Sequence, residues 1–137
     1  MKLPIEGGCA CRKIRYSCSV EPLLMINCNC RDCQYSSGTG HSTVFAMQRS
    51  AVTITGEAKY YEVKSDQGNL VHRGFCEDCG SPLFAGNDKF KDFIAIKAGS
   101  LDDSSWFKPS VDIWTCSAQP WDMLSPDTQK FEKELLM

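Results

Sequence analysis

The cysteines of this chain are the feature that most restricts how it can fold. Nine cysteines occur in 137 residues, and most of them stand in short clusters. Cysteines one or two residues apart seldom meet the geometry that a disulfide bond between them requires. Clustered cysteines are instead typical of metal sites and catalytic thiols in reducing compartments. We therefore interpret the clusters as metal ligands.

The spacing of the clusters predicts two zinc ions per chain, bound in two different ways. Zinc prefers four tetrahedral ligands, and one tight turn can present two thiolates to one ion. The chain contains two pairs and one trio: Cys9 with Cys11, Cys76 with Cys79, and Cys28, Cys30 and Cys33. Together the two pairs give a complete structural site that closes a long loop. The trio then has three ligands and an open position, which is the pattern of a catalytic zinc.

Other ligand arrangements stay open at this point. His41, His72 or Cys116 could complete the trio, and both ions would then be structural. Cys76 and Cys79 could also share an ion with two members of the trio. Spacing alone does not decide between these arrangements.

Strand patterns dominate the rest of the chain. Residues Lys13 to Val20 alternate between apolar and polar side chains, which predicts a half-buried strand with Cys18 as a small core residue. Further strand-like runs, rich in β-branched and aromatic residues, are residues 43–47, 51–55, 59–63, 70–75 and 93–98. Helix is expected only in a turn after Cys30 and in a short segment near Thr128 to Leu136. We expect a single, mainly β, zinc-binding domain over residues 1–137.

The composition argues against several classes of partner. The hydrophobic content is 42%, the charged content is 23%, and the formal net charge is −2, so no basic excess favours nucleic acid or anionic lipid. The first residues lack the apolar run of a signal peptide, and no segment approaches the roughly 18 apolar residues of a membrane span. We expect a cytoplasmic protein that does not bind nucleic acid or membranes.

Beyond the cysteines, the chain resembles the glutathione-dependent formaldehyde-activating enzyme family, also called the centromere protein V family. The resemblance is carried by GGCAC (residues 7–11), CNCRDC (28–33), FCEDCGSPL (75–83), KAGSLDD (97–103) and AQPW (118–121). It implies an Mss4-like fold of several short, coiled β-sheets. It also implies the same division into a four-cysteine zinc site and a second zinc on the trio. The chain departs from the family at Ala10 and Asp112, where a histidine is common, and at Cys116, where a serine is usual.

The resemblance implies carbon–sulfur lyase chemistry on the adduct of glutathione, or another small thiol, with formaldehyde or a related aldehyde. An open zinc suits this chemistry because coordination deprotonates a thiol whose ordinary pKa is about 8.5. The alternative is a carrier module that binds the thiol on zinc without catalysis. A third hypothesis, a protein-binding surface with two structural ions, rests on the centromere-associated members alone. Binding an anionic tripeptide would need cationic groups, for which the chain offers Arg31, Arg73, Lys64 and Lys97; each is interpreted first as a solvated surface charge, so no glutathione contact is assigned to them.

Overall fold

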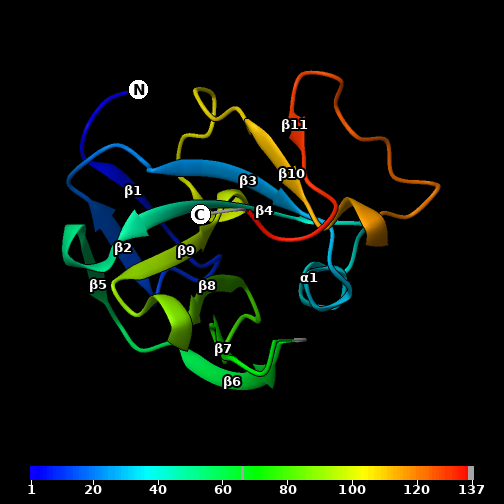
Figure 1. Cartoon of the computed structure of the whole chain (residues 1–137). Helices are drawn as coiled ribbons and strands as arrows, with labels where there is room; N and C mark the ends of the chain where they lie inside the picture. Colours follow the sequence, from blue (N-terminus) through cyan, green and yellow to red (C-terminus); the bar gives the residue numbers. More distant parts are fainter. Residues whose placement is uncertain (66, 136–137) are drawn as a thin grey trace.

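Two β-sheets form the framework of the protein. The computed structural model describes residues 1–65 and 67–135. The smaller sheet is antiparallel and has the strand order β1-β2-β5; its strands are β1 (Ile5–Gly8), β2 (Arg15–Cys18) and β5 (Val52–Thr55). The larger sheet has the order β11-β10-β3-β4-β9-β8-β7-β6, and Figure 1 shows the smaller sheet beside its β4 and β9 region. The strands of the larger sheet are β3 (Leu24–Cys28), β4 (Ser42–Gln48), β6 (Lys59–Lys64), β7 (Leu70–Phe75), β8 (Pro82–Asn87), β9 (Phe93–Lys97), β10 (Val111–Ile113) and β11 (Gln129–Lys130).

A parallel segment lies at one side of the larger sheet. β10 pairs in parallel with β3 and with β11, whereas the other neighbouring strands of this sheet are antiparallel. This pairing places Ile113 opposite Cys28, and on its other side Cys28 is opposite Ser42 of β4. The end of β3 is therefore held between two strands, and this fixes the start of the trio.

Helical structure is short in this protein. The α-helix α1 (Arg31–Ser37) follows β3, and the 3-10 helices are η1 (Arg49–Ala51), η2 (Asp88–Phe90), η3 (Ala98–Ser100) and η4 (Thr115–Ser117). Gly38 caps the C-terminus of α1 in the left-handed conformation (φ 77°), and its backbone amide donates a hydrogen bond to the carbonyl of Gln34. Within residues 1–65 and 67–135, no helix has the length and apolar character that crossing a membrane requires.

The core lies where side chains of the two sheets meet. Phe45 and Met47 of β4 and Ile96 of β9 are fully buried. The ring of Tyr16 in the smaller sheet lies 6.5 Å from that of Phe45 and 6.0 Å from that of Phe84 in the larger sheet, measured between centroids. Packing of aromatic rings between the sheets therefore fixes how they sit together.

The structure confirms the mainly β fold and corrects several details. All six expected strands are present with small shifts at their ends, and the helix after Cys30 is α1. Val20 is exposed rather than buried, because β2 ends at Cys18. The helix expected near Thr128 to Leu136 is wrong over the described residues, which contain β11 instead; Leu136 lies outside them. The strands β1, β3, β8, β10 and β11 were not predicted.

Leu83→Ala is predicted to lower the free energy of unfolding by about 2–5 kcal/mol, because the side chain is fully buried and its loss leaves a cavity. Leu70→Ala is the matched control, since Leu70 is 38% exposed and its truncation should cost far less. Denaturant unfolding of both variants measures the difference. Equal losses would contradict the assigned core.

Candidate metal centres

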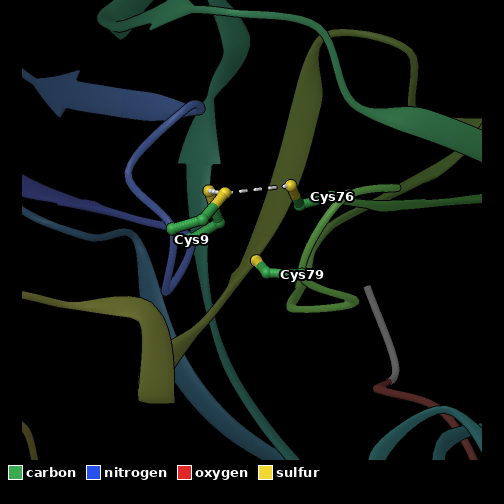
Figure 2. Close-up of side chains that lie close together, drawn as sticks. Cys9, Cys76 and Cys79 are labelled. Atoms are coloured by element: carbon green, nitrogen blue, oxygen red, sulfur yellow. Dashed lines mark hydrogen bonds between the residues drawn. The ribbon is translucent and has the colours of Figure 1, made fainter.

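The two cysteine pairs come together in one cluster, as the spacing predicts. The sulfur atoms of Cys9, Cys11, Cys76 and Cys79 all lie within 4.8 Å of one another. The Cys9–Cys11 and Cys11–Cys76 sulfur separations are both 3.6 Å. A tetrahedron with metal–sulfur bonds of about 2.3 Å has edges of about 3.8 Å, so the arrangement fits a zinc ion. Figure 2 shows Cys76 and Cys79 on one turn, with their sulfur atoms directed towards Cys9 on another.

The two turns that carry these pairs have the same backbone plan. In one the amide of Cys9 donates to the carbonyl of Ile14, and in the other the amide of Cys76 donates to that of Ser81. Each turn has a residue in the left-handed region directly after its second cysteine: Arg12 with φ 67° and Gly80 with φ 77°. This conformation lets the chain reverse tightly, so that both sulfur atoms of a pair face the same point.

Hydrogen bonds favour the thiolate form at Cys9 and Cys79, whereas the pKa of Cys11 is raised to about 12, an effect to which the neighbouring Cys9, Cys76 and Cys79 thiols contribute. Burial raises the pKa of Cys9, but the amide of Ile14, 3.3 Å from its sulfur, together with the Cys11 and Cys76 thiols, lowers it below the ordinary value. The hydroxyl of Ser81 lies 3.2 Å from the Cys79 sulfur and is the main cause of a pKa lowered to about 5. Thiolates are the form that binds metals.

The trio forms a second, separate cluster around the start of α1. The sulfur atoms of Cys28, Cys30 and Cys33 lie within 4.8 Å of one another. Cys28 ends β3, Cys30 is the N-cap of α1, and its sulfur accepts a hydrogen bond of 3.3 Å from the amide of Cys33. Hydrogen bonds with Cys28 and Cys30, followed by the charges of Arg73 and Lys97, hold the pKa of Cys33 well below its usual value. Cys76 and Cys79 are not members of this cluster.

The loop of the trio is anchored by a buried polar network. The side chain of Asn29 donates to Asp112 (3.2 Å) and to the carbonyl of Ile113 (3.0 Å). Gln34 of α1 donates to the carbonyls of Asn29 (2.8 Å) and Ser117 (2.9 Å). Asn29, Gln34 and Asp112 are all buried. This network holds the cysteines in place through their neighbours, as is usual around metal sites.

Among the described residues, no fourth ligand completes the trio. His41, His72 and Cys116 are not in its group, and neither is any other His, Cys, Asp or Glu. Nδ1 of His41 lies 2.6 Å from Asp122, Nε2 of His72 lies 2.6 Å from Asp88, and Cys116 is exposed. Asp112 accepts hydrogen bonds from Asn29 and Thr128. In the described part of the chain, the cluster therefore has three thiol donors only.

Two basic side chains border the trio, which the interpretation as surface charges did not anticipate. Arg31 and Lys64 are exposed as expected, but Arg73 and Lys97 are buried, with 8% and 9% of their surface exposed. Burial lowers the pKa of Lys97. Both residues belong to strand segments that the sequence predicted. Their burial was not predictable, because the cluster that they contact is far away in the sequence and the neighbouring residues carry no pattern that indicates it.

Two hollows lie away from the trio. One borders the four-cysteine cluster next to Lys13 and Cys76, and the other lies over β7, β8 and β9 next to Tyr60 and His72. Neither includes a cysteine of the trio. The trio is therefore distinguished by the thiol chemistry of its cysteines and not by either hollow.

Comparison with known proteins gives the family. The profile described as "GFA: Glutathione-dependent formaldehyde-activating enzyme" matches residues 4–117. The chain belongs to this family. It is 31% identical over 118 residues to a Penicillium rubens protein named "Putative glutathione-dependent formaldehyde-activating enzyme". That alignment covers 77% of this chain and 61% of the relative, so the chain spans less than two thirds of the relative's length.

A solved structure supports the fold of this family member. A crystal structure of a Rhodobacter sphaeroides protein superposes with a TM-score of 0.58 at 13% sequence identity. The superposition covers 76% of this chain and 96% of the other. At this level of identity the similarity concerns the fold alone.

Gly80→Ala is predicted to destabilise the metal-loaded protein by about 1–2 kcal/mol, because alanine is strained in the left-handed region. An added Cβ at Gly80 meets nothing within 4 Å, so a steric clash does not contribute. Gly99→Ala is the control, since its Cβ also meets nothing within 4 Å and its φ is not positive. Thermal or denaturant unfolding compares the two. A loss no larger than that of the control would contradict the turn assignment.

Proposed function

We propose that residues 1–137 form one zinc-binding unit that carries two zinc ions. The ligands of the structural ion are Cys9, Cys11, Cys76 and Cys79, and those of the second ion are Cys28, Cys30 and Cys33. The four-sulfur geometry supports the first site. The three-thiol group, without a fourth donor in the described residues, supports an open position at the second.

The function proposed for this chain is zinc-dependent carbon–sulfur lyase-like chemistry on adducts of a small thiol, such as glutathione, with formaldehyde or a related aldehyde. The observation that carries the proposal is the open trio in a member of this family. A zinc ion with an open position supplies Lewis acidity that favours the thiolate form of a bound thiol. The family name supports this class of substrate.

The residues of the chain have distinct tasks in this proposal. Cys28, Cys30 and Cys33 supply the thiolates, and Cys33 has the pKa best suited to this form. Asn29 and Gln34 keep the loop and α1 fixed, so that the open position stays available.

One observation favours a second candidate, a carrier that binds the thiol without catalysis. In the described residues no histidine or carboxylate belongs to the trio. Asp112 is buried and takes part in the network that anchors the loop. A carrier needs only the open position, whereas an enzyme also benefits from a group that moves protons.

Elemental mass spectrometry of the purified protein is predicted to give about two zinc ions per chain, falling to about one in Cys30→Ser, because the trio would lose a thiolate ligand. Cys116→Ser is the matched control: Cys116 is exposed and outside both clusters, so this variant should keep both ions. One ion in all three proteins would contradict metal binding by the trio.

The rate of adduct formation from glutathione and formaldehyde is predicted to rise above the spontaneous rate in proportion to protein concentration, and Cys30→Ser should abolish the excess. The uncatalysed background must be measured in parallel, because the adduct also forms without enzyme. Saturable glutathione binding without an excess rate would favour the carrier. Absence of both would refute thiol chemistry at the trio.

A further inference from the structure

Arg73 of β7 and Lys97 of β9 are two buried cations without a carboxylate partner in the described residues. They are 8% and 9% exposed, and neither takes part in the ion pairs found there. Burying a charge is costly unless an opposite charge or several hydrogen bonds compensate it. The Nε of Arg73 is buried and has no hydrogen-bond partner. This pair is therefore poorly compensated by the protein alone.

Both cations converge on the trio and the helix that carries it. Arg73 donates to the sulfur of Cys33 (3.9 Å) and to the hydroxyl of Ser36 (3.3 Å). Lys97 donates to the same Ser36 hydroxyl (3.3 Å) and to that of Ser42, which lies opposite Cys28 in the sheet. The hydroxyl groups stabilise the cations but carry no charge. The sulfur atoms of the trio are the groups beside them that become negative.

The charges of the trio and of this pair match only with an anionic fourth ligand. Three thiolates around a divalent ion leave one unit of negative charge. A neutral fourth ligand, such as water or imidazole, leaves that value unchanged, and the two cations then exceed it by one unit. A thiolate in the fourth position brings the centre to two negative units, which Arg73 and Lys97 balance.

Among residues 1–65 and 67–135, no comparable pair of buried cations borders the four-cysteine cluster. Its neighbouring basic residue Lys13 is exposed and is already paired with Asp78 at 2.7 Å. Cys11 and Cys79 are themselves exposed, so water can screen the charge of that centre. Buried cations are therefore a property of the trio and not of thiolate clusters in this protein generally.

We propose that Arg73 and Lys97 are specificity-determining residues, whose buried charges make the trio centre select an anionic fourth ligand, a thiolate, over neutral ligands. This inference rests on the proposed function, because it needs a metal ion on the trio. The incoming thiol binds through its sulfur as the thiolate, and its proton passes to the solvent. The selection acts on the sulfur itself, so it extends to thiols that carry no carboxylate.

The test uses the protein loaded with cobalt(II), whose visible absorption reports the ligands around the ion. Dissociation constants are measured at one pH and ionic strength for 2-mercaptoethanol, imidazole and glutathione. Lys97→Gln and Arg73→Gln remove the charges but keep hydrogen-bond donors, whereas Lys97→Arg keeps the charge. Lys59→Gln is an exposed control. Metal content and circular dichroism accompany each measurement.

Each Gln variant is expected to bind 2-mercaptoethanol about ten- to a hundredfold more weakly, since a unit charge a few ångströms from the ligand acts at this scale. Imidazole binding should change by less than about twofold, and Lys97→Arg and Lys59→Gln should behave like the wild type. The uncharged thiol matters because glutathione also carries carboxylates. A loss confined to glutathione would mean that the cations bind those carboxylates, and it would overturn the proposal.

Other results are equally decisive. Equal weakening for 2-mercaptoethanol and imidazole, or no weakening in either Gln variant, would overturn the proposal while leaving the proposed function intact. Folded Gln variants that lose the metal of the trio would show that the cations hold the cysteine thiolates themselves, which also overturns it. If the Gln variants do not fold, the test is made on the wild-type protein with thiocyanate, an anion that is not a thiol. The wild type should bind thiocyanate more tightly than imidazole. Tighter binding of imidazole would overturn the proposal. A wild type that binds no thiol at all would refute the proposed function and this inference together.

Discussion

The convergence of four sulfur atoms from two distant turns is the constraint on which the rest of the structure depends. Cys11 and Cys76 are 65 residues apart, yet their sulfur atoms lie 3.6 Å from each other. The first turn joins β1 to β2 in the smaller sheet, and the second joins β7 to β8 in the larger sheet. A bond to a shared metal ion would therefore clamp the two sheets together where their aromatic side chains meet. Closing so long a loop costs chain entropy, and the free energy of metal binding would offset part of that cost, which otherwise falls on side-chain packing alone.

The trio is held in a different way, by the pairing of strands rather than by a second turn. Cys28 lies between Ile113 of β10 and Ser42 of β4, and both the backbone amide and the side chain of Asn29 donate hydrogen bonds to the carbonyl of Ile113, at the end of β10. Because three ligands come from one short segment, the cluster does not depend on bringing distant cysteines together. If a metal ion binds there, folding places no demand on its fourth position. This difference in construction would allow one metal centre to join the two sheets while the other keeps an open position.

The sequence predicts those features that depend on local spacing. Paired cysteines, the strand alternation of residues 13–20 and the helix after Cys30 are visible because each signal lies within a few residues. The prediction of a C-terminal helix is wrong because β11 pairs with β10. The residues of β11 carry no local sequence pattern that indicates this pairing. The strand β10 has three residues, too few for a periodic pattern to be recognised. The joining of the two cysteine pairs could be predicted, because a structural zinc ion requires four ligands and two pairs of cysteines supply that number.

The burial of Arg73 and Lys97 could not be predicted from the sequence. Each looks like an ordinary strand residue with a charged side chain, and such side chains usually face water. Only the assembled sheet shows that both reach the helix of the trio, through the shared hydroxyl of Ser36. Selection for folding alone would favour neutral residues at such sites, because an uncompensated buried charge is destabilising. Their presence beside the three thiols of the trio, and not beside the four-cysteine cluster, links their charge to the chemistry of the trio rather than to the stability of the fold.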